Sequence, residues 1–251
     1  MDDYAAVSKG QGGPMVKVPA GAFKMGSDNK DKDALKRERP RRTIDLSTFW
    51  IDVHELTNGR YEKCVEAKGC AKARTKGVPR RGYYARTEAP DQPVVGVTLK
   101  DAQDYCRWVG RRLPTEMEWE KAARGTDGRI YPWGNQKPNC KRANYNRCGK
   151  VALRPGSKPK GVSPYGAHDM AGNVIEWTST IYNADFLAKM KAKDPPEPLR
   201  GHWRVIRGGS WGSYTNQIRS ATRRAWKPDF AGHTIGFRCV SSVDPGDAVA
   251  P

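Results

Sequence analysis

The chain has 251 residues and a formal charge of +18, from 45 basic and 27 acidic side chains. No apolar run reaches the length of a membrane-spanning helix, and residues 1–14 lack the apolar core of a signal peptide, which excludes a helical membrane protein. Glycine and proline contribute 26 and 18 residues, so we expect many turns and few long helices.

The first part of the chain predicts short elements after a flexible leader at residues 1–14. Residues 15–26 alternate apolar and polar side chains around a Pro-Ala-Gly turn, which predicts a hairpin. Residues 44–53 alternate again and predict one strand. A helix is expected to follow with Thr57 as its cap, because Tyr61, Cys64 and Val65 then share one face.

The middle of the chain begins with a basic, turn-rich surface loop at residues 67–92 and a buried strand at 93–97. Thr98 with Asp101, and Thr115 with Glu118, have the spacing of capping boxes and predict two helices. The apolar positions of the second helix are Trp119, Ala122 and Ala123, and Gly110 is expected to end the first.

Beyond the second helix, short glycine-punctuated segments are expected up to residue 240. Only residues 186–193 show a further, weak helical pattern. Residues 244–251 are small and polar, which predicts a flexible tail.

The basic residues gather in three runs, at 36–42, 72–86 and 189–193, which we interpret as solvated loops. The alternative is a surface that binds polyanions, with Lys72, Arg74, Arg80 and Arg81 as its contacts. No helix-turn-helix, zinc-finger or RNA-recognition pattern is present, so nucleic acid is not the expected partner.

The six cysteines include two pairs that lie close together in the sequence. Cys64 with Cys70, and Cys140 with Cys148, each flank a short polar loop. No Cys-x-x-Cys motif occurs and neither loop contains histidine, so disulfides are favoured over zinc, while free thiols remain the alternative. Disulfides predict an extracytoplasmic protein that is periplasmic, a lipoprotein or secreted, with any export leader outside this sequence.

Six motifs occur in a fixed order. They are DVHELTN at 52–58, GRRLPTEMEWE at 110–120, YPWGN at 131–135, AGNVIEW at 171–177, RGGSW at 207–211 and GFRC at 236–239. In order and spacing they resemble the sulfatase-modifying-factor family of formylglycine-generating enzymes. The resemblance implies an α+β, C-type-lectin-like domain with little regular secondary structure, which we place at residues 15–243.

The resemblance also implies a third disulfide and a metal site. It pairs Cys106 with Cys239. It implies structural calcium held by four residues of one loop, namely Asp169, Gly172, Val174 and Glu176, although Glu176 could instead only bind backbone amides. The family's second calcium site is not expected, because residues 148–158 contain no acidic side chain, and the Cys140–Cys148 disulfide would clamp that loop.

The family's enzymes oxidise a substrate cysteine with Cu(I) held by two thiolates, shortly after their Gly-Gly-Ser motif. Residues 211–219 contain no cysteine here, and Ser213 and its neighbours are hard, neutral groups that do not hold Cu(I), so no copper is expected.

The resemblance therefore implies a catalytically degenerate, non-redox domain whose groove binds a peptide, a protein or an acidic small ligand. Alternatives are an enzyme of unrecognised chemistry that uses His233, a polyanion-binding surface protein, and core or ion-pair roles for the same side chains. The candidate groove residues are Ser210, Trp211, Tyr214, Asn216, Arg219, Arg223, Arg224, Trp226 and His233.

Overall fold

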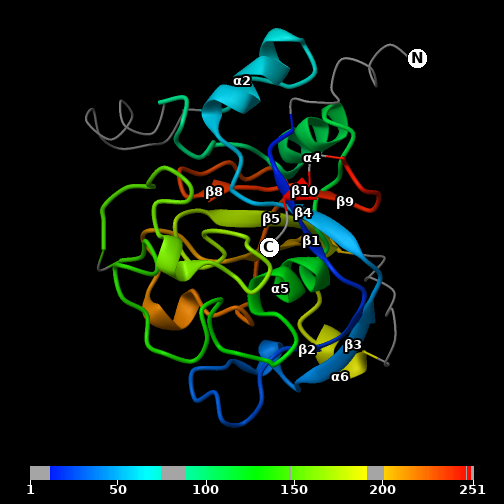
Figure 1. The fold of residues 1–251 in the computed structure, drawn as a ribbon, viewed down its shortest axis with the longest axis vertical. Helices are drawn as coiled ribbons and strands as arrows, with labels where there is room; N and C mark the ends of the chain where they lie inside the picture. The colour runs from blue at the N-terminus through cyan, green and yellow to red at the C-terminus, as the bar shows by residue number, and fades with distance from the viewer. Residues whose placement is uncertain (1–11, 75–88, 147, 191–200, 247, 250–251) are drawn as a thin grey trace.

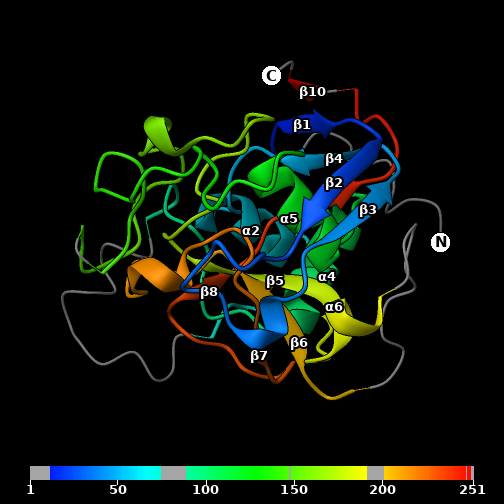
Figure 2. The same cartoon turned by 90° about the horizontal axis from the view of Figure 1, so that it is seen from below.

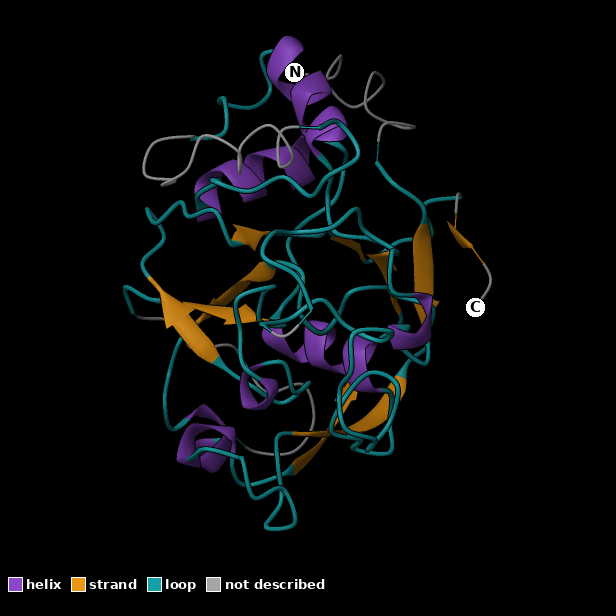
Figure 3. Cartoon of the chain, turned by 90° about the vertical axis from the view of Figure 1, so that its left-hand side faces the viewer, coloured by secondary structure: helices purple, strands orange, loops and turns teal. Residues whose placement is uncertain are grey.

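The computed structural model describes residues 12–74, 89–146, 148–190, 201–246 and 248–249 (Figure 1). Helices and strands in these segments are short and are joined by long loops, as the glycine and proline content predicts (Figure 3). The described strands form two four-stranded sheets and one two-stranded sheet. No helix in these segments is long and apolar enough to cross a membrane.

The first sheet joins the two ends of the described chain. Its order is β10 (Ala248–Val249), β1 (Met15–Val18), β4 (Phe49–Asp52) and β9 (Val240–Ser241). Strand β1 is antiparallel to β4 and parallel to β10 (Figure 2). The sequence did not predict that residues in the C-terminal segment pair with β1.

The second sheet contains β2 (Gly21–Met25) and β3 (Arg42–Leu46), which are antiparallel. The hairpin expected at residues 15–26 is therefore wrong, because β1 and β2 belong to different sheets and pair with distant strands. The single strand expected at 44–53 is wrong too. It divides into β3 and the fully buried β4, and Thr48 between them accepts a hydrogen bond from the amide of Ala20 at 3.0 Å.

The third sheet has the order β7 (Arg224–Trp226), β6 (Arg204–Arg207), β5 (Ile175–Ile181) and β8 (Ile235–Gly236). Strand β5 is antiparallel to β6 and parallel to β8, and β7 is the edge strand. The strand expected at residues 93–97 is wrong: Pro93 forms only an isolated bridge with Thr57. Val94 and Val97 are nevertheless buried, which is what the apolar run reflected.

The helices are α2 (Asn58–Glu66), α4 (Leu99–Trp108), α5 (Glu116–Arg124) and α6 (Phe186–Lys189), with 3-10 turns η1 (Lys36–Glu38), η2 (Pro159–Gly161) and η3 (Thr215–Gln217). Both predicted capping boxes are confirmed, since Thr98 and Thr115 accept hydrogen bonds from the third residue of α4 and α5. The side chain of Thr57 makes no such bond at α2. Gly110 follows α4 with φ of 72°.

Helix α5 lies near the centre of the molecule, and all nine of its residues are buried, charged ones included (Figure 1). The carboxylate of Glu120 accepts a hydrogen bond from Arg124 at 2.7 Å and also pairs with Arg207. Lys121 donates to the carbonyls of Pro19 and Gly21 at 2.7 and 2.8 Å. The predicted apolar stripe is therefore only part of the buried surface, and the charges are tolerated because each has a partner.

Three disulfides are present, and they confirm the predicted pairings. The Cα–Cα distances are 5.3 Å for Cys64–Cys70, 5.6 Å for Cys106–Cys239 and 5.0 Å for Cys140–Cys148, within the ordinary range. The second disulfide connects α4 to the residue before β9. All six cysteines of the chain lie in described segments, and none is free.

Candidate functional site

Strand β6 is followed by a tight turn, at the position where the enzymes that the sequence resembles have their reactive thiols. We call residues 210–213 the serine turn. Gly209, just before it, has φ of 72°, and a Cβ there would lie 2.9 Å from the carbonyl oxygen of Gln217. The Oγ of Ser213 accepts a hydrogen bond from the amide of Ser210 at 2.9 Å, and the two hydroxyl oxygens are 3.5 Å apart. Both serines are buried, so the hydroxyls support the turn.

Trp211 and His233 lie side by side next to the serine turn, with ring centroids 6.0 Å apart. Both side chains are half-buried. The Trp211 amide donates to the carbonyl of Asn173 at 2.9 Å, and burial lowers the pKa of His233. Tyr214 and Asn216 are exposed on the following residues, Tyr214 by 64%. These four predicted residues therefore surround the turn on its accessible side.

Two predicted ligand-binding arginines are instead part of the core. Arg219 pairs with Asp31 at 2.7 Å and with Glu38 at 2.8 Å, and its side chain is only 2% exposed. Arg223 donates to both carboxylate oxygens of Glu116, at 2.5 and 2.6 Å, and is fully buried. Their assignment to a ligand groove is corrected, because both guanidinium groups are already engaged by buried carboxylates.

The basic run at residues 36–42 is also more structural than expected. The guanidinium of Arg37 donates to the carbonyl of Arg223, and that of Arg41 pairs with Asp28 at 2.6 Å. The guanidinium of Arg42 donates to two backbone carbonyls within α6. These arginines connect loops rather than forming one solvated patch. Arg80 and Arg81, expected in a polyanion surface, lie outside the described residues.

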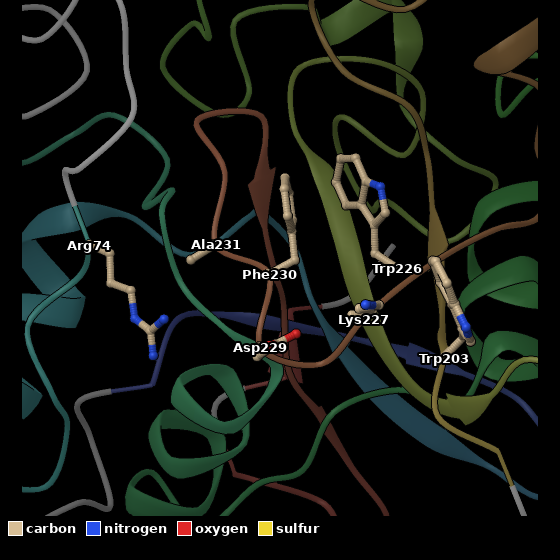
Figure 4. Close-up of a pocket in the computed structure, with 7 residues that line it drawn as sticks. All are labelled: Arg74, Trp203, Trp226, Lys227, Asp229, Phe230 and Ala231. Carbon is tan, nitrogen blue, oxygen red and sulfur yellow. The ribbon is translucent and has the colours of Figure 1, made fainter.

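The last two predicted groove residues, Arg224 and Trp226, lie half-buried on β7, where Arg224 pairs with Ile206 near the end of β6 and Trp226 pairs with Arg204 at its beginning. Trp226 lines a hollow of about 640 Å³ (Figure 4). We call it the aromatic hollow. Its lining residues are Arg74, Trp203, Trp226, Lys227, Asp229, Phe230 and Ala231.

The aromatic hollow exposes large apolar side chains. Trp203 is 44% exposed and Phe230 is 39% exposed. The Phe230 ring lies against Trp226, with centroids 4.3 Å apart and planes at 39°. Trp203 and Phe230 escaped prediction because they lie in irregular segments, where no periodic pattern marks them. The sequence signal that could have identified them is an aromatic residue within a polar, glycine-containing segment.

Backbone hydrogen bonds hold the two sides of the hollow together. The amide of Arg74 donates to the carbonyl of Gly96 at 2.7 Å, and the amide of Gly96 donates to Gly232 at 3.0 Å. Gly96 has φ of 74°, and a Cβ there would approach the Arg74 carbonyl oxygen to 2.2 Å. The loop carrying Phe230 is fixed to α4 through the Leu99 amide, which donates to Pro228 at 3.0 Å. The backbone of the segments that carry Arg74 and Phe230 is thus held in place.

The loop expected to hold calcium contains a buried group of carboxylates. Glu176 forms two hydrogen bonds of 2.8 Å with Arg238 and accepts a third from Trp119 at 2.7 Å. Asp169 accepts from the amide of Gly156 at 2.6 Å. Burial raises the pKa of Asp169 to about 6, even though that amide and Arg238 oppose the shift.

Glu55 is a member of this group that sequence reasoning missed. It accepts hydrogen bonds from the Val174 amide at 3.0 Å and from Asn173. Burial raises its pKa, and the charges of Asp169 and Glu176 add to the effect. In the described residues, no group of three His, Cys, Asp or Glu side chains is arranged to hold a metal. Any cation here would depend on backbone carbonyls as well.

Comparison with known proteins identifies the family to which this fold and these motifs belong. Residues 2–243 match the model of the sulfatase-modifying factor enzyme 1-like domain. The chain is 32% identical to the inactive C-alpha-formylglycine-generating enzyme 2 of Bos taurus, over 97% of this chain and 94% of that protein. It is 34% identical to the serine/threonine-protein kinase pkn1 of Chlamydia pneumoniae, but it covers only 38% of that relative's length.

Among solved structures, PvdO from Pseudomonas aeruginosa superimposes with a TM-score of 0.78 at 26% identity, covering 92% of this chain and 95% of PvdO. This likeness confirms the expected α+β, C-type-lectin-like fold. The match of residues 2–243 to the family model and the identity to a relative along nearly its whole length place the chain in the sulfatase-modifying-factor family, as a formylglycine-generating-enzyme-like domain.

Proposed function

We propose that this domain is a non-redox member of its family and binds a peptide or an acidic ligand instead of oxidising a cysteine. The observation that carries the proposal is that every cysteine of the chain is in a disulfide, while the serine turn contains only hydroxyl groups. Cu(I) favours soft ligands such as thiolates, and hydroxyls hydrogen-bonded within a turn do not replace them. The inactive relative from Bos taurus supports this interpretation.

Binding requires accessible side chains, and the surface around the serine turn provides them. Trp211, Tyr214, Asn216 and His233 lie around the serine turn with their side chains exposed or half-buried. Their aromatic rings offer stacking, and their amide and imidazole groups offer hydrogen bonds. The disulfides support an extracytoplasmic location, where such a module meets ligands outside the reducing cytosol.

We also propose structural calcium at the loop of residues 169–176. Three buried carboxylates, on Glu55, Asp169 and Glu176, share the single guanidinium of Arg238, which leaves an excess of negative charge that suits a divalent cation. The carbonyls of Gly172 and Val174, with the carboxylates of Asp169 and Glu176, would hold the ion. Calcium would supply charge compensation and fix the loop that leads into β5.

The redox part of the proposal is tested with a cysteine-containing sulfatase peptide, oxygen and Cu(I), followed by mass spectrometry. We expect no aldehyde product, while an active formylglycine-generating enzyme in the same buffer converts the peptide. The binding part is tested on an array of immobilised peptides of mixed charge, with Trp211→Ala as the variant. Aldehyde formation, or an absence of any peptide binding, would contradict the proposal.

A further inference from the structure

We infer that the aromatic hollow is a binding site for an acidic peptide segment that carries an aromatic side chain. This inference rests on the proposed function of the domain as a binding module, and it names a site and a ligand class. The site lies at β7 and the loop after it, whereas the serine turn follows the opposite end of β6. The loop after β7 joins the two surfaces, because Ala231 lines the hollow and His233 lies against Trp211. Variants at Trp203 and Lys227 nevertheless test the hollow alone.

The hollow has the dimensions and the surface of a ligand site. Its volume of about 640 Å³ lies within the range of small-ligand pockets. Trp203 and Phe230 each expose more than a third of their surface there, which is unusual for side chains that stabilise a protein by burial. An aromatic ring placed against Trp203 and Trp226 would bury apolar area in an offset or edge-to-face arrangement.

The charges of the hollow favour an anionic ligand. Arg74 and Lys227 contribute two cationic groups to the lining, and Asp229 contributes one carboxylate. Figure 4 shows Arg74 and Lys227 on separate sides of the Phe230 ring, so that two carboxylates of one ligand can be neutralised at the same time. The Asp229 carboxylate can accept a hydrogen bond from a tyrosine hydroxyl or a peptide amide.

The sheet favours a peptide over an acidic glycan or other polyanion. Trp226 is on β7, which pairs with β6 and is the last strand of its sheet among the described strands. An edge strand presents backbone N–H and C=O groups that an extended peptide can meet with its own. The beginning of this edge is occupied, since Arg37 donates to the carbonyl of Arg223 at 2.8 Å, so the peptide would lie along Arg224–Trp226.

The test uses a fluorescein-labelled random copolymer of glutamate and tyrosine, with binding measured by fluorescence anisotropy on the full, disulfide-bonded chain. Polyglutamate, a lysine–tyrosine copolymer and heparin are the comparison probes. We expect the glutamate–tyrosine copolymer to bind at least about tenfold more tightly than polyglutamate. Trp203→Ala should weaken it by about tenfold, as for a central aromatic contact, and Lys227→Glu should weaken it by a similar factor.

Matched controls separate the hollow from the rest of the surface. Val243→Ala shortens an exposed apolar side chain after β9, and Lys150→Glu reverses an exposed charge elsewhere. Neither should change the affinity by more than about twofold. Because Trp203 and Lys227 are exposed, their variants should unfold at the wild-type temperature, and far-UV circular dichroism checks this.

Each other outcome would overturn the inference. If the copolymer binds but only Trp211→Ala or Tyr214→Ala weakens it, the proposed function stands and the ligand lies at the serine turn. Equal binding of polyglutamate and heparin, with a steep loss of affinity in salt, would show a polyanion surface instead. If the copolymer does not bind although peptides on the array do, the ligand class is wrong.

Discussion

Replacing Arg223 with glutamine tests whether this arginine supports the fold or binds a ligand. Its fully buried guanidinium donates to both oxygens of Glu116 at 2.5 and 2.6 Å and lies 5.5 Å from the centre of the Phe186 ring. Glutamine would leave the Glu116 carboxylate buried without its counter-charge. Removing one partner of such a pair costs about 3–5 kcal/mol, which for a chain of this size lowers the unfolding temperature by about 6–20 °C.

Thermal and urea unfolding without reductant, followed by tryptophan fluorescence, measures this loss. Arg224→Gln is the matched control, because Arg224 is the next residue and only half-buried, and it should change the free energy of unfolding by less than about 0.5 kcal/mol. The double variant Glu116→Met/Arg223→Met should recover much of the loss, since no unpaired charge remains. A loss below about 1 kcal/mol for Arg223→Gln would refute the structural role.

Three further predictions concern the disulfide, the histidine pair and the calcium loop. The Cys106–Cys239 disulfide spans 133 residues, so its replacement by two alanines should cost about 5 kcal/mol in the chain-entropy account, measured by urea unfolding; a loss below about 2 kcal/mol would contradict this. Burial, with the nearby His168, lowers the pKa of His54 to about 4. The folded state then binds fewer protons than the unfolded state, so stability is complete above about pH 6.5 and is lost as the pH falls toward 4. After allowance for partial exposure, His54→Gln should reduce the loss between pH 7 and pH 5 by about 1 kcal/mol, and an unchanged pH profile would exclude His54 as its source. For an assumed Kd of about 10 μM, 1 mM calcium should raise the free energy of unfolding of the wild type by about 2.7 kcal/mol and that of Asp169→Asn by far less. The measurement is calorimetric unfolding of chelator-treated protein with and without added calcium, and an equal gain for both proteins would place the ion elsewhere.

Local features of the fold were predictable from sequence patterns, whereas the long-range pairings of the strands were not. The one long-range pairing that was predicted, Cys106–Cys239, came from the family resemblance. The caps at Thr98 and Thr115 were recognised because the groups that form them are three residues apart. The hairpin at residues 15–26 failed because both strands contact segments remote in sequence, which outcompete the local turn. Alternation identified residues that form strands but not the strands they pair with.

The candidate site shows the same division. Trp226 was found because it lies close to the family motifs, whereas Trp203 and Arg74 reach the hollow from separate parts of the chain. Arg219 looked available for a ligand because its partner Asp31 is far away in sequence. An arginine's role depends on whether a buried carboxylate faces it, and only the tertiary structure establishes this.

The burial of paired charges has a consequence for how quickly this domain meets its ligands. Among the described residues, the buried charged side chains comprise ten acids and six bases, a net formal charge of −4. Since the whole chain carries +18, all other residues together carry +22. The residues outside the buried set therefore carry more positive charge than the composition of the whole chain suggests. Association with an acidic ligand should therefore be electrostatically steered, with a rate constant that falls as salt rises while the dissociation rate changes little.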